Sequence, residues 1–341
     1  PNRIIFYRFG SEQDGWSAEY QMRTPPSVQQ NKSSAVKVLV VGDMGTHSRD
    51  EFTQHWGCPP SRNTTDAMLA EVQGNNLDAG LVLHVGDLSY AVGYASVWDQ
   101  FHEQIAPISS QIPWMVALGN HERDWPGTGS NGLIDSGGEC GVPTELRFRM
   151  PWNQRIIDKP WYSFNYGPIH FSVLSSEHDF EEQYPWMKED LSAVDRSKTP
   201  WVVVSLHRPV YIDSINYMPI DGDQTIAKQL RLVFEDLFME HEVDLVLAGH
   251  HHSYQRSCPL YQHECKQSKE GEYAAPVYVI SGNAGFSLTP TVFPIPPKWM
   301  KVVDIRHHGY TRITADKTSF TLEYVRGDDR QVHDTVVLKR H

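Results

Sequence analysis

Short apolar runs recur along the chain from residue 36 onward, and each ends in a polar, often glycine-containing tip. The runs are rich in β-branched residues, and longer amphipathic stretches such as 66–73 and 225–240 lie between them. This pattern is typical of buried strands that alternate with helices. It predicts an α/β domain in which helices cover a sheet. The predicted strands are 36–41, 81–85, 114–118, 169–174, 201–206, 245–248 and 277–280.

Both ends of the chain have the pattern of β-structure. Residues 4–9 and 17–23 predict two strands around a turn at 11–15, followed by the breaker at 24–26. Because an isolated hairpin is marginal in water, we expect it to be the end of a β-domain whose beginning is missing, or else to dock on the main domain. The antiparallel strands that we expect to close the fold are 309–314, 319–325 and 335–339.

Composition narrows the classes of function. The chain has 341 residues, enough for one large domain or a medium domain with a small appendage. Lys and Arg number 30 and Asp and Glu 42, which gives a formal net charge of −12. We therefore expect no nucleic-acid binding and no anionic membrane surface as partner. No apolar run approaches the ~18–20 residues of a membrane span. The 17 histidines direct attention to a metal site.

The four cysteines allow three disulfide connectivities; they are Cys58, Cys140, Cys258 and Cys265. None forms a CxxC pair, so a zinc ribbon is not expected. Cys258 and Cys265 flank a short loop that a disulfide could close, which would leave Cys58 and Cys140 for a second bridge. The alternative is four free, buried thiols.

Two glycosylation sequons start at Asn31 and Asn63. Each triplet is weak on its own, because such triplets are common by chance. Together with possible disulfides they favour a secreted or lumenal protein, in an extracellular or lysosome- or vacuole-like compartment.

Five strand ends carry ligand types that are limited to oxygen and imidazole groups. A single Asp after a strand is more often a cap or turn residue than a metal ligand. Five such ends are hard to explain as accidents, because sites in α/β sheets lie just past the carboxyl ends of the strands. The five motifs are GDMG at 42–45, GDLSY at 86–90, GNHE at 119–122, VSLH at 204–207 and GHHH at 249–252.

These residue types predict a pair of metal ions. Two ions about 3.5–4 Å apart need a shared carboxylate against their mutual repulsion, and separate ligands for each. Carboxylates and an Asn carbonyl suit Mn or Fe, and imidazoles suit Fe or Zn. His250 and His252 lie two residues apart and can diverge from a local turn to serve different metals. The motifs hold no thiolate, which argues against a structural zinc site.

The ordered set GDxG, GDxxY, GNHE, VxxH and GHxH resembles the purple acid phosphatases of the calcineurin-like metallophosphoesterase superfamily, and Tyr90 indicates the purple branch. The stretches 119–125, 136–143 and 258–265 resemble the larger eukaryotic members. The resemblance implies an α/β metallophosphoesterase-type β-sandwich flanked by helices at 36–341. It also implies a linker at 27–35, and at 1–26 the end of a truncated fibronectin-III-like β-domain.

The resemblance also implies the cofactors and their ligands. The ferric site would be built from Asp43, Asp87, Tyr90 and His252, and the divalent site from Asp87 as bridge with Asn120, His207 and His250. The metals would be Fe(III) with Fe, Zn or Mn, and the Tyr90 phenolate on iron would give a purple colour. A metal-activated hydroxide would attack phosphorus in line. His121 would stabilise the phosphoryl oxygens or protonate the leaving alkoxide, and Glu122 would orient His121.

The chain departs from the family at one substrate contact. Plant members often carry a His pair in the loop after VxxH, but the loop 211–217 contains no His. His178, His251 and Asn216 are candidate replacements. The alternatives are an ordinary loop or outer role for His178 and a solvent-facing side chain for His251. We expect His84 to pack in the core.

The sequence leaves three candidate functions. The first is an acid phosphatase that hydrolyses monoesters of small molecules or phosphoproteins. The second is a nucleotide pyrophosphatase or phosphodiesterase that uses the same site. The third, a non-catalytic secreted binding protein, is disfavoured because all seven ligand positions and His121 are intact.

Overall fold

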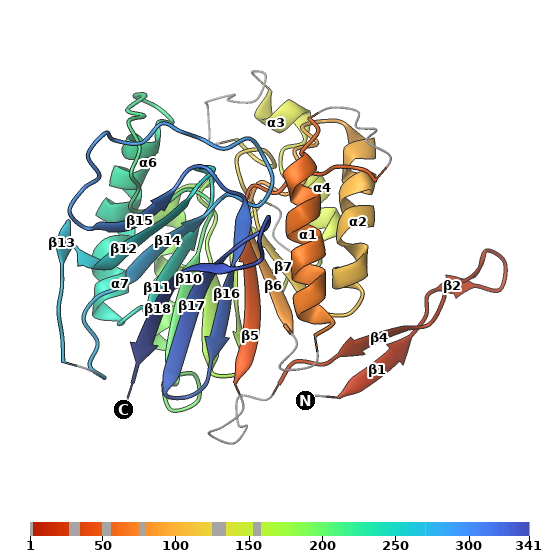
Figure 1. Ribbon diagram of the computed structural model, residues 1–341, viewed down its shortest axis with the longest axis horizontal. Helices are drawn as coiled ribbons and strands as arrows, with labels where there is room; N and C mark the ends of the chain where they lie inside the picture. The colour runs from red at the N-terminus through yellow and green to blue at the C-terminus, as the bar shows by residue number, and fades with distance from the viewer. Residues whose placement is uncertain are drawn as a thin grey trace.

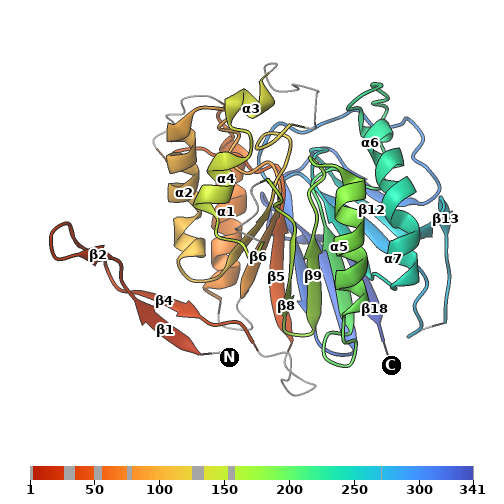
Figure 2. The same ribbon diagram turned by 180° about the vertical axis from the view of Figure 1, so that it is seen from behind.

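The computed structural model describes residues 3–26, 35–49, 56–74, 79–124, 134–152, 158–269 and 271–340. Two mixed sheets pack face to face as a sandwich, and helices cover both outer faces (Figures 1 and 2). The predicted α/β sandwich flanked by helices is confirmed.

The first sheet has six strands in the order β18-β17-β16-β5-β6-β7. Its three strands β5, β6 and β7 are parallel, and the other three are antiparallel to their neighbours. The helices α1 (Pro59–Val72) and α2 (Ala95–Ser109) lie beside this sheet (Figure 1). The strands are β5 (Val36–Val41), β6 (Leu81–Val85), β7 (Trp114–Ala117), β16 (Gly309–Ala315), β17 (Ser319–Arg326) and β18 (Val332–Lys339).

The second sheet has the order β13-β12-β14-β11-β10-β9-β8, and β15 pairs with β12. Strands β9, β10, β11 and β14 run parallel. The strands are β8 (Tyr162–Tyr166), β9 (Ile169–Val173), β10 (Trp201–Ser205), β11 (Leu245–Ala248), β12 (Tyr254–Tyr261), β13 (Glu264–Cys265), β14 (Val277–Ser281) and β15 (Met300–Asp304). The helices beside it are α5 (Phe180–Ser192), α6 (Asp223–Leu230) and α7 (Asp236–Glu240), and a π-helical segment, Arg231–Glu235, joins α6 to α7.

The core explains why the central strands are apolar at every position. Val203 of β10 belongs to the cluster between the two sheets, whereas Val202 and Val204 pack in the cluster that contains Phe180 of α5 and Phe234. Because both faces of β10 are buried, its sequence has no polar alternation. Because the faces of the central strands are packed against other parts of the protein, we expect the reactive side chains in the loops at the strand ends.

The predicted N-terminal hairpin is present. β1 (Ile4–Tyr7) pairs antiparallel with β4 (Tyr20–Arg23), and the pair β2 (Gly10–Ser11) and β3 (Gly15–Trp16) extends it. The hairpin protrudes from the lower edge of the molecule in Figure 1. Its Tyr7 hydroxyl donates to the Ser110 carbonyl, 2.7 Å away, just beyond α2. The hairpin therefore contacts the main domain at one end of that helix.

The cysteines confirm one predicted disulfide and contradict the other. Cys258 and Cys265 are bonded and link β12 to β13. Cys58 and Cys140 are free, so the predicted Cys58–Cys140 bridge is wrong, as is the alternative of four free thiols. The Cys58 thiol is buried against Gly45 at the start of α1, whereas Cys140 lies exposed on another loop.

Of the two sequons, Asn31 lies outside the described residues. Asn63 is exposed on α1, and the hydroxyl of its sequon partner Thr65 is buried and donates to the Ser61 carbonyl. Among the helices of the described ranges, none is long and apolar enough to cross a membrane.

Candidate metal centre

The loops after β5 and β6 carry the two candidate aspartates side by side. The Asp43 N–H donates to the Gly86 carbonyl and the Met44 N–H to the Asp87 carbonyl, both at 3.2 Å. These bonds continue the parallel pairing of the strands beyond their ends. Asp43 and Asp87 both adopt left-handed backbone conformations, with φ of 58° and 50°. Such conformations cost energy outside glycine, and their presence at a site is typical of functional constraint.

Asp43, Asp87 and His252 present ligand atoms that all lie within 4.8 Å of one another. The Tyr90 phenol oxygen joins them, 3.3 Å from Asp43 Oδ1 and 3.0 Å from His252 Nε2. The predicted ferric-site residues therefore converge from three separate loops. Phe286 stacks on the Tyr90 ring with 3.9 Å between centroids and covers its face.

Asn120, His207 and His250 form a second group next to Asp87. The Asn120 carboxamide oxygen lies 3.1 Å from His207 Nε2 and 2.8 Å from His250 Nδ1. His207 Nε2 lies 3.3 Å from Asp87 Oδ1, so Asp87 stands between the two groups. Gly119 permits this approach, because a Cβ there would lie 2.2 Å from Asp87 Oδ1.

Hydrogen bonds on the far side of each ring orient the three histidines. His207 Nδ1 donates to the Val85 carbonyl at 2.9 Å, and His252 Nδ1 to the Ser287 carbonyl at 2.6 Å. His250 Nε2 lies 3.3 Å from Asp223 Oδ1. With its proton on the outer nitrogen, a neutral ring in this orientation would present its inner nitrogen to a metal, as metal-binding histidines do.

The donor set fits metal ions. Asp43 and Asp87 are buried within one volume, and a cation between them would offset the repulsion of two like charges. Burial raises the pKa of Asp43. Burial also raises the pKa of Asp87, but the charges and hydrogen bonds of His207 and His121 together outweigh it and hold that pKa well below its usual range. Burial and the nearby Arg208 charge lower the pKa of His250 to about 3, which favours the neutral imidazole that binds metals. Carboxylate, phenol, amide and imidazole donors together suit Fe, Zn or Mn.

His121 lies beside Asp87, but Glu122 does not orient it. His121 Nε2 is 3.8 Å from Asp87 Oδ2, and the His121 backbone N–H donates to Asp87 Oδ1 at 2.9 Å. Its Nδ1 is buried with no partner among the described residues. The predicted Glu122–His121 contact is therefore wrong, because the backbone turns the Glu122 side chain away from the ring.

Glu122 instead holds two loops of the site together. Its carboxylate accepts three backbone N–H groups, from Asp87 at 2.9 Å, Leu88 at 2.8 Å and Gly119 at 3.0 Å. The side chain is fully buried. Glu122 therefore fixes the loop of Asp87 relative to the loop of Asn120.

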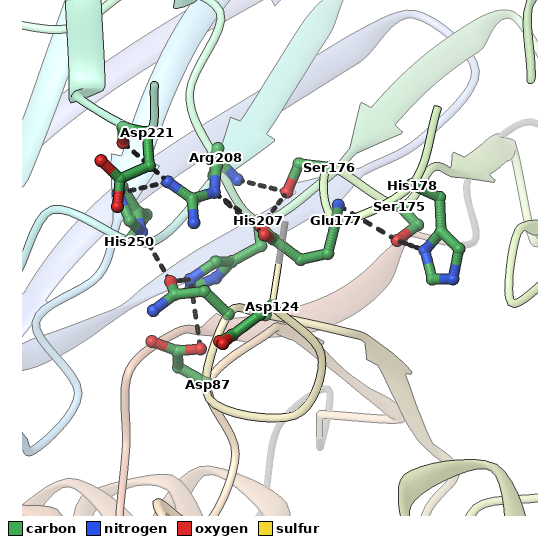
Figure 3. A network of polar contacts seen from close by, with 12 residues as sticks. Asp87, Asp124, Ser175, Ser176, Glu177, His178, His207, Arg208, Asp221 and His250 are labelled. Atoms are coloured by element: carbon green, nitrogen blue, oxygen red, sulfur yellow. Dashed lines mark hydrogen bonds and ion pairs between the residues drawn. The ribbon is translucent and has the colours of Figure 1, made fainter. Parts of the chain in front are cut away.

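A buried ion pair that the sequence did not reveal supports the second group. Arg208 Nε donates to Glu177 Oε1 at 2.8 Å, and Arg208 Nη1 lies 3.5 Å from His250 Nε2 and donates to the Asp221 carbonyl. Figure 3 shows Arg208 between Glu177 on one side and Asp221 and His250 on the other. Arg208 directly follows His207, so one short segment supplies a candidate ligand and a supporting cation.

The three predicted substrate contacts bond to residues around the centre. His178 lies beyond Glu177 in Figure 3, between Ser175 Oγ at 2.7 Å and Asp158 Oδ1 at 2.9 Å. His251 is buried against Ser253, so the alternative of a solvent-facing side chain is wrong. Asn216 donates to Asp223, the partner of His250. His84 packs in the core, as expected, against the rings of Phe101 and Trp114.

The stretch 136–143 also buttresses the centre. The Ser136 hydroxyl donates to the Asn120 carbonyl at 2.9 Å. Glu139 accepts the Gly93 N–H at 2.9 Å and the Trp98 indole N–H at 3.0 Å, which ties this stretch to the loop after Tyr90. Sequence likeness pointed to this stretch, but it gave no reason for these contacts.

Comparisons with known proteins place the chain in a family. Residues 36–254 match the calcineurin-like phosphoesterases, and residues 275–335 match the iron/zinc purple acid phosphatase-like protein C family. The chain therefore belongs to the calcineurin-like metallophosphoesterases. Within them it belongs to the purple acid phosphatases.

Individual relatives carry differing names. The solved structure of purple acid phosphatase PPD1 from yellow lupin (Lupinus luteus) seeds is similar with a TM-score of 0.89 and 36% identity, over 100% of this chain and 60% of that one. A barley (Hordeum vulgare) nucleotide pyrophosphatase/phosphodiesterase is 38% identical over 95% of this chain and 88% of its own length. Probable inactive purple acid phosphatase 24 of Arabidopsis thaliana is 37% identical, over 100% of this chain and 56% of its own length. The chain thus spans little more than half of some of its relatives.

Proposed function

We propose that the protein is an acid phosphatase that hydrolyses phosphate monoesters at a binuclear metal centre. One observation carries the proposal: seven donor side chains from five loops converge on one volume, and each histidine among them is oriented by an outer hydrogen bond. The proposed ligands are Asp43, Asp87, Tyr90 and His252 for one metal and Asp87, Asn120, His207 and His250 for the other.

Fe(III) with Fe, Zn or Mn as the second ion would polarise the phosphate and make water nucleophilic near neutral pH. The residues of the chain provide the rest. Asp87 stands between the two groups and would bridge them. His121, beside Asp87, is within reach of a phosphoryl group held there and would donate to its oxygens or to the leaving alkoxide. Glu122 keeps the loops of Asp87 and Asn120 in register.

A nucleotide pyrophosphatase or phosphodiesterase is the second candidate. The observation that favours it is the name of the barley relative, which is 38% identical over 95% of this chain. The same ligands and His121 would act on a diester or a diphosphate, so the two candidates differ only in what surrounds the phosphorus.

The names of several relatives also raise a non-catalytic role. Probable inactive purple acid phosphatases 24 and 27 of Arabidopsis thaliana are 37% and 36% identical to this chain. Here all seven proposed ligands and His121 are retained. We therefore favour catalysis over a non-catalytic secreted binding protein.

The test is a matched pair of histidine variants. We expect the wild-type protein to bind two metal ions per chain and to hydrolyse p-nitrophenyl phosphate, with slower turnover of bis-p-nitrophenyl phosphate and of nucleoside diphosphates. His207→Ala should lose turnover and one metal ion. His333→Ala, at an exposed position on β18, should keep its turnover and both metal ions. Wild-type turnover in His207→Ala would overturn the metal assignment. Faster cleavage of the diester or the diphosphate would favour the second candidate.

We further propose that residues 1–26 end a fibronectin-III-like β-domain and that the protein enters the secretory pathway. The Cys258–Cys265 disulfide and the exposed Asn63 support an oxidising, glycosylating compartment. Expression in a eukaryotic secretory host with enzymatic deglycosylation tests this. A mass shift that Asn31→Gln and Asn63→Gln together remove is the expected result, and protein without glycan would contradict it.

A further inference from the structure

Trp56 is an exposed tryptophan that lies against the proposed active site. Its side chain is 39% exposed, yet its ring meets His121 edge-on with 5.7 Å between centroids. It meets Phe286 at 5.7 Å and Tyr90 at 6.2 Å in the same edge-on manner. A single exposed apolar side chain is ordinary, but one that touches three rings of a catalytic site is not placed at random.

The four rings form a wall that runs from the metal ligands to the surface. Tyr90 is almost fully buried and stacks on Phe286, which also contacts the His252 ring at 5.2 Å. Trp56 is the outermost ring of this wall and the one with a large exposed surface. A ligand that leaves the centre past His121 therefore meets Trp56.

We infer that Trp56 packs against the leaving group and selects phosphate esters whose leaving group is aromatic. This inference rests on the proposed function, in which His121 acts at the leaving oxygen. A ring that touches His121 is next to the first atoms beyond that oxygen. Tryptophan suits this role because its flat, rigid surface forms edge and stacked contacts with other rings.

A shielding role would make a different prediction. If Trp56 only covers the centre from solvent, its removal would slow all substrates alike. A second exposed aromatic, Tyr217, contacts Phe293 on another loop and is 63% exposed. If that surface receives the leaving group, Tyr217→Ala and not Trp56→Ala would change the preference.

The experiment compares an aryl and an alkyl substrate. For Trp56→Ala we expect kcat/KM on phenyl phosphate to fall about tenfold, the scale of one lost aromatic contact with its buried area. On glycerol 3-phosphate we expect a change within about twofold, since glycerol offers no ring. Trp56→Phe should be intermediate. The control Trp16→Ala removes a tryptophan of similar exposure, 44%, from the N-terminal hairpin. It should leave kcat/KM for both substrates unchanged.

Calorimetric binding of phenylphosphonate and methylphosphonate provides a readout that needs no turnover. We expect Trp56→Ala to weaken phenylphosphonate about tenfold and to leave methylphosphonate unchanged. A wild-type protein that hydrolyses neither ester would contradict the proposed function, while this binding ratio would still test Trp56. Equal losses on both substrates, an unchanged phenylphosphonate affinity, or a selective loss in Tyr217→Ala would each overturn the inference.

Discussion

The phenol oxygen of Tyr90, an almost fully buried residue, lies 3.0 Å from Nε2 of His252. Burial, with the negative charges of Asp87 and Asp43, raises the pKa of Tyr90 well above its usual range. The phenol therefore stays protonated unless a strongly Lewis-acidic metal ion displaces its proton. A ferric ion at this position would do so.

The first prediction concerns colour. We expect the iron-loaded protein to show a broad visible absorption band and Tyr90→Phe to lack it, because the band requires a phenolate on Fe(III). Tyr162→Phe, which changes another buried tyrosine whose hydroxyl donates to the Val116 carbonyl, is the control and should keep the band. A band that persists in Tyr90→Phe would show that Tyr90 is not a ligand.

The second prediction concerns Glu122. In Glu122→Gln, an amide N–H₂ group replaces one of the two carboxylate oxygens that accept these hydrogen bonds. At least one of the three buried backbone N–H groups then loses its acceptor. We expect a loss of about 1–3 kcal/mol in the free energy of unfolding and weaker metal retention. Urea unfolding and metal analysis after dialysis measure these, with the exposed Glu181→Gln as control. Unchanged metal retention would contradict a role in holding the Asp87 and Asn120 loops.

The third prediction concerns the buried pair of Arg208 and Glu177. Glu177→Leu leaves the guanidinium without its carboxylate next to His250, and loss of one partner of a buried pair costs about 3–5 kcal/mol. The double variant Glu177→Leu/Arg208→Met should recover part of that loss, since no unpaired charge remains. Urea unfolding of the four proteins in the cycle gives the coupling energy. Additive losses would show that the two side chains act independently.

The fourth prediction concerns the thiols. Burial raises the pKa of the Cys58 thiol to about 12, so Cys58 should resist thiol reagents in the native protein, whereas exposed Cys140 should react. Denaturation without reductant should expose two thiols, and reduction should expose all four. Cys140→Ser is the control that should remove the native reaction. If no thiol is labelled in the denatured, unreduced protein, Cys58 and Cys140 form a second disulfide and the prediction is wrong.

The sequence predicted strands best where both faces are buried. Runs 36–41, 81–85 and 245–248 coincide with β5, β6 and β11, because short, mainly apolar runs without polar alternation are typical of strands that are buried on both faces. Strand β12 was missed, since it carries Arg256 and combines buried with half-buried positions in no regular order. Helix α1 begins at Pro59 and not at 66, because its polar first turns are buried through hydrogen bonds to Gln104 of α2.

In the site, the sequence identified residues that belong to local motifs but not the contacts between residues that are distant in the chain. The motif residues were recognisable because each lies at the end of an apolar run. Arg208 and Glu177 are 31 positions apart, and no spacing in the sequence marks their pairing. Adjacency misled in the case of Glu122, which follows His121 in the chain but bonds to backbone 34 and 35 positions away. Spatial pairing of this kind follows from the loop geometry alone.

The fifth prediction is a pH dependence from Glu71 on α1. Its carboxylate bonds to Lys37 Nζ of β5 at 3.0 Å and to Tyr310 and Arg312 of β16, so it joins the helix to two neighbouring strands. Burial raises the pKa of Glu71, but the hydrogen bond from Lys37 and the charge of Arg312 outweigh it and lower the pKa below 4.5. The folded state therefore favours the carboxylate. The stability that Glu71 contributes is complete above about pH 4.5 and is lost as the pH falls through the lowered value.

Glu71→Gln should accordingly lose about 1 kcal/mol at neutral pH, the scale of a partly exposed ion pair in a network. The difference from wild type should shrink as the pH drops below 4.5, because the wild-type carboxyl then protonates too. Urea unfolding across this pH range measures the difference, and exposed Glu19→Gln is the control. A difference that stays constant down to the lowest pH would mean that Glu71 stabilises the fold through packing and not through its charge.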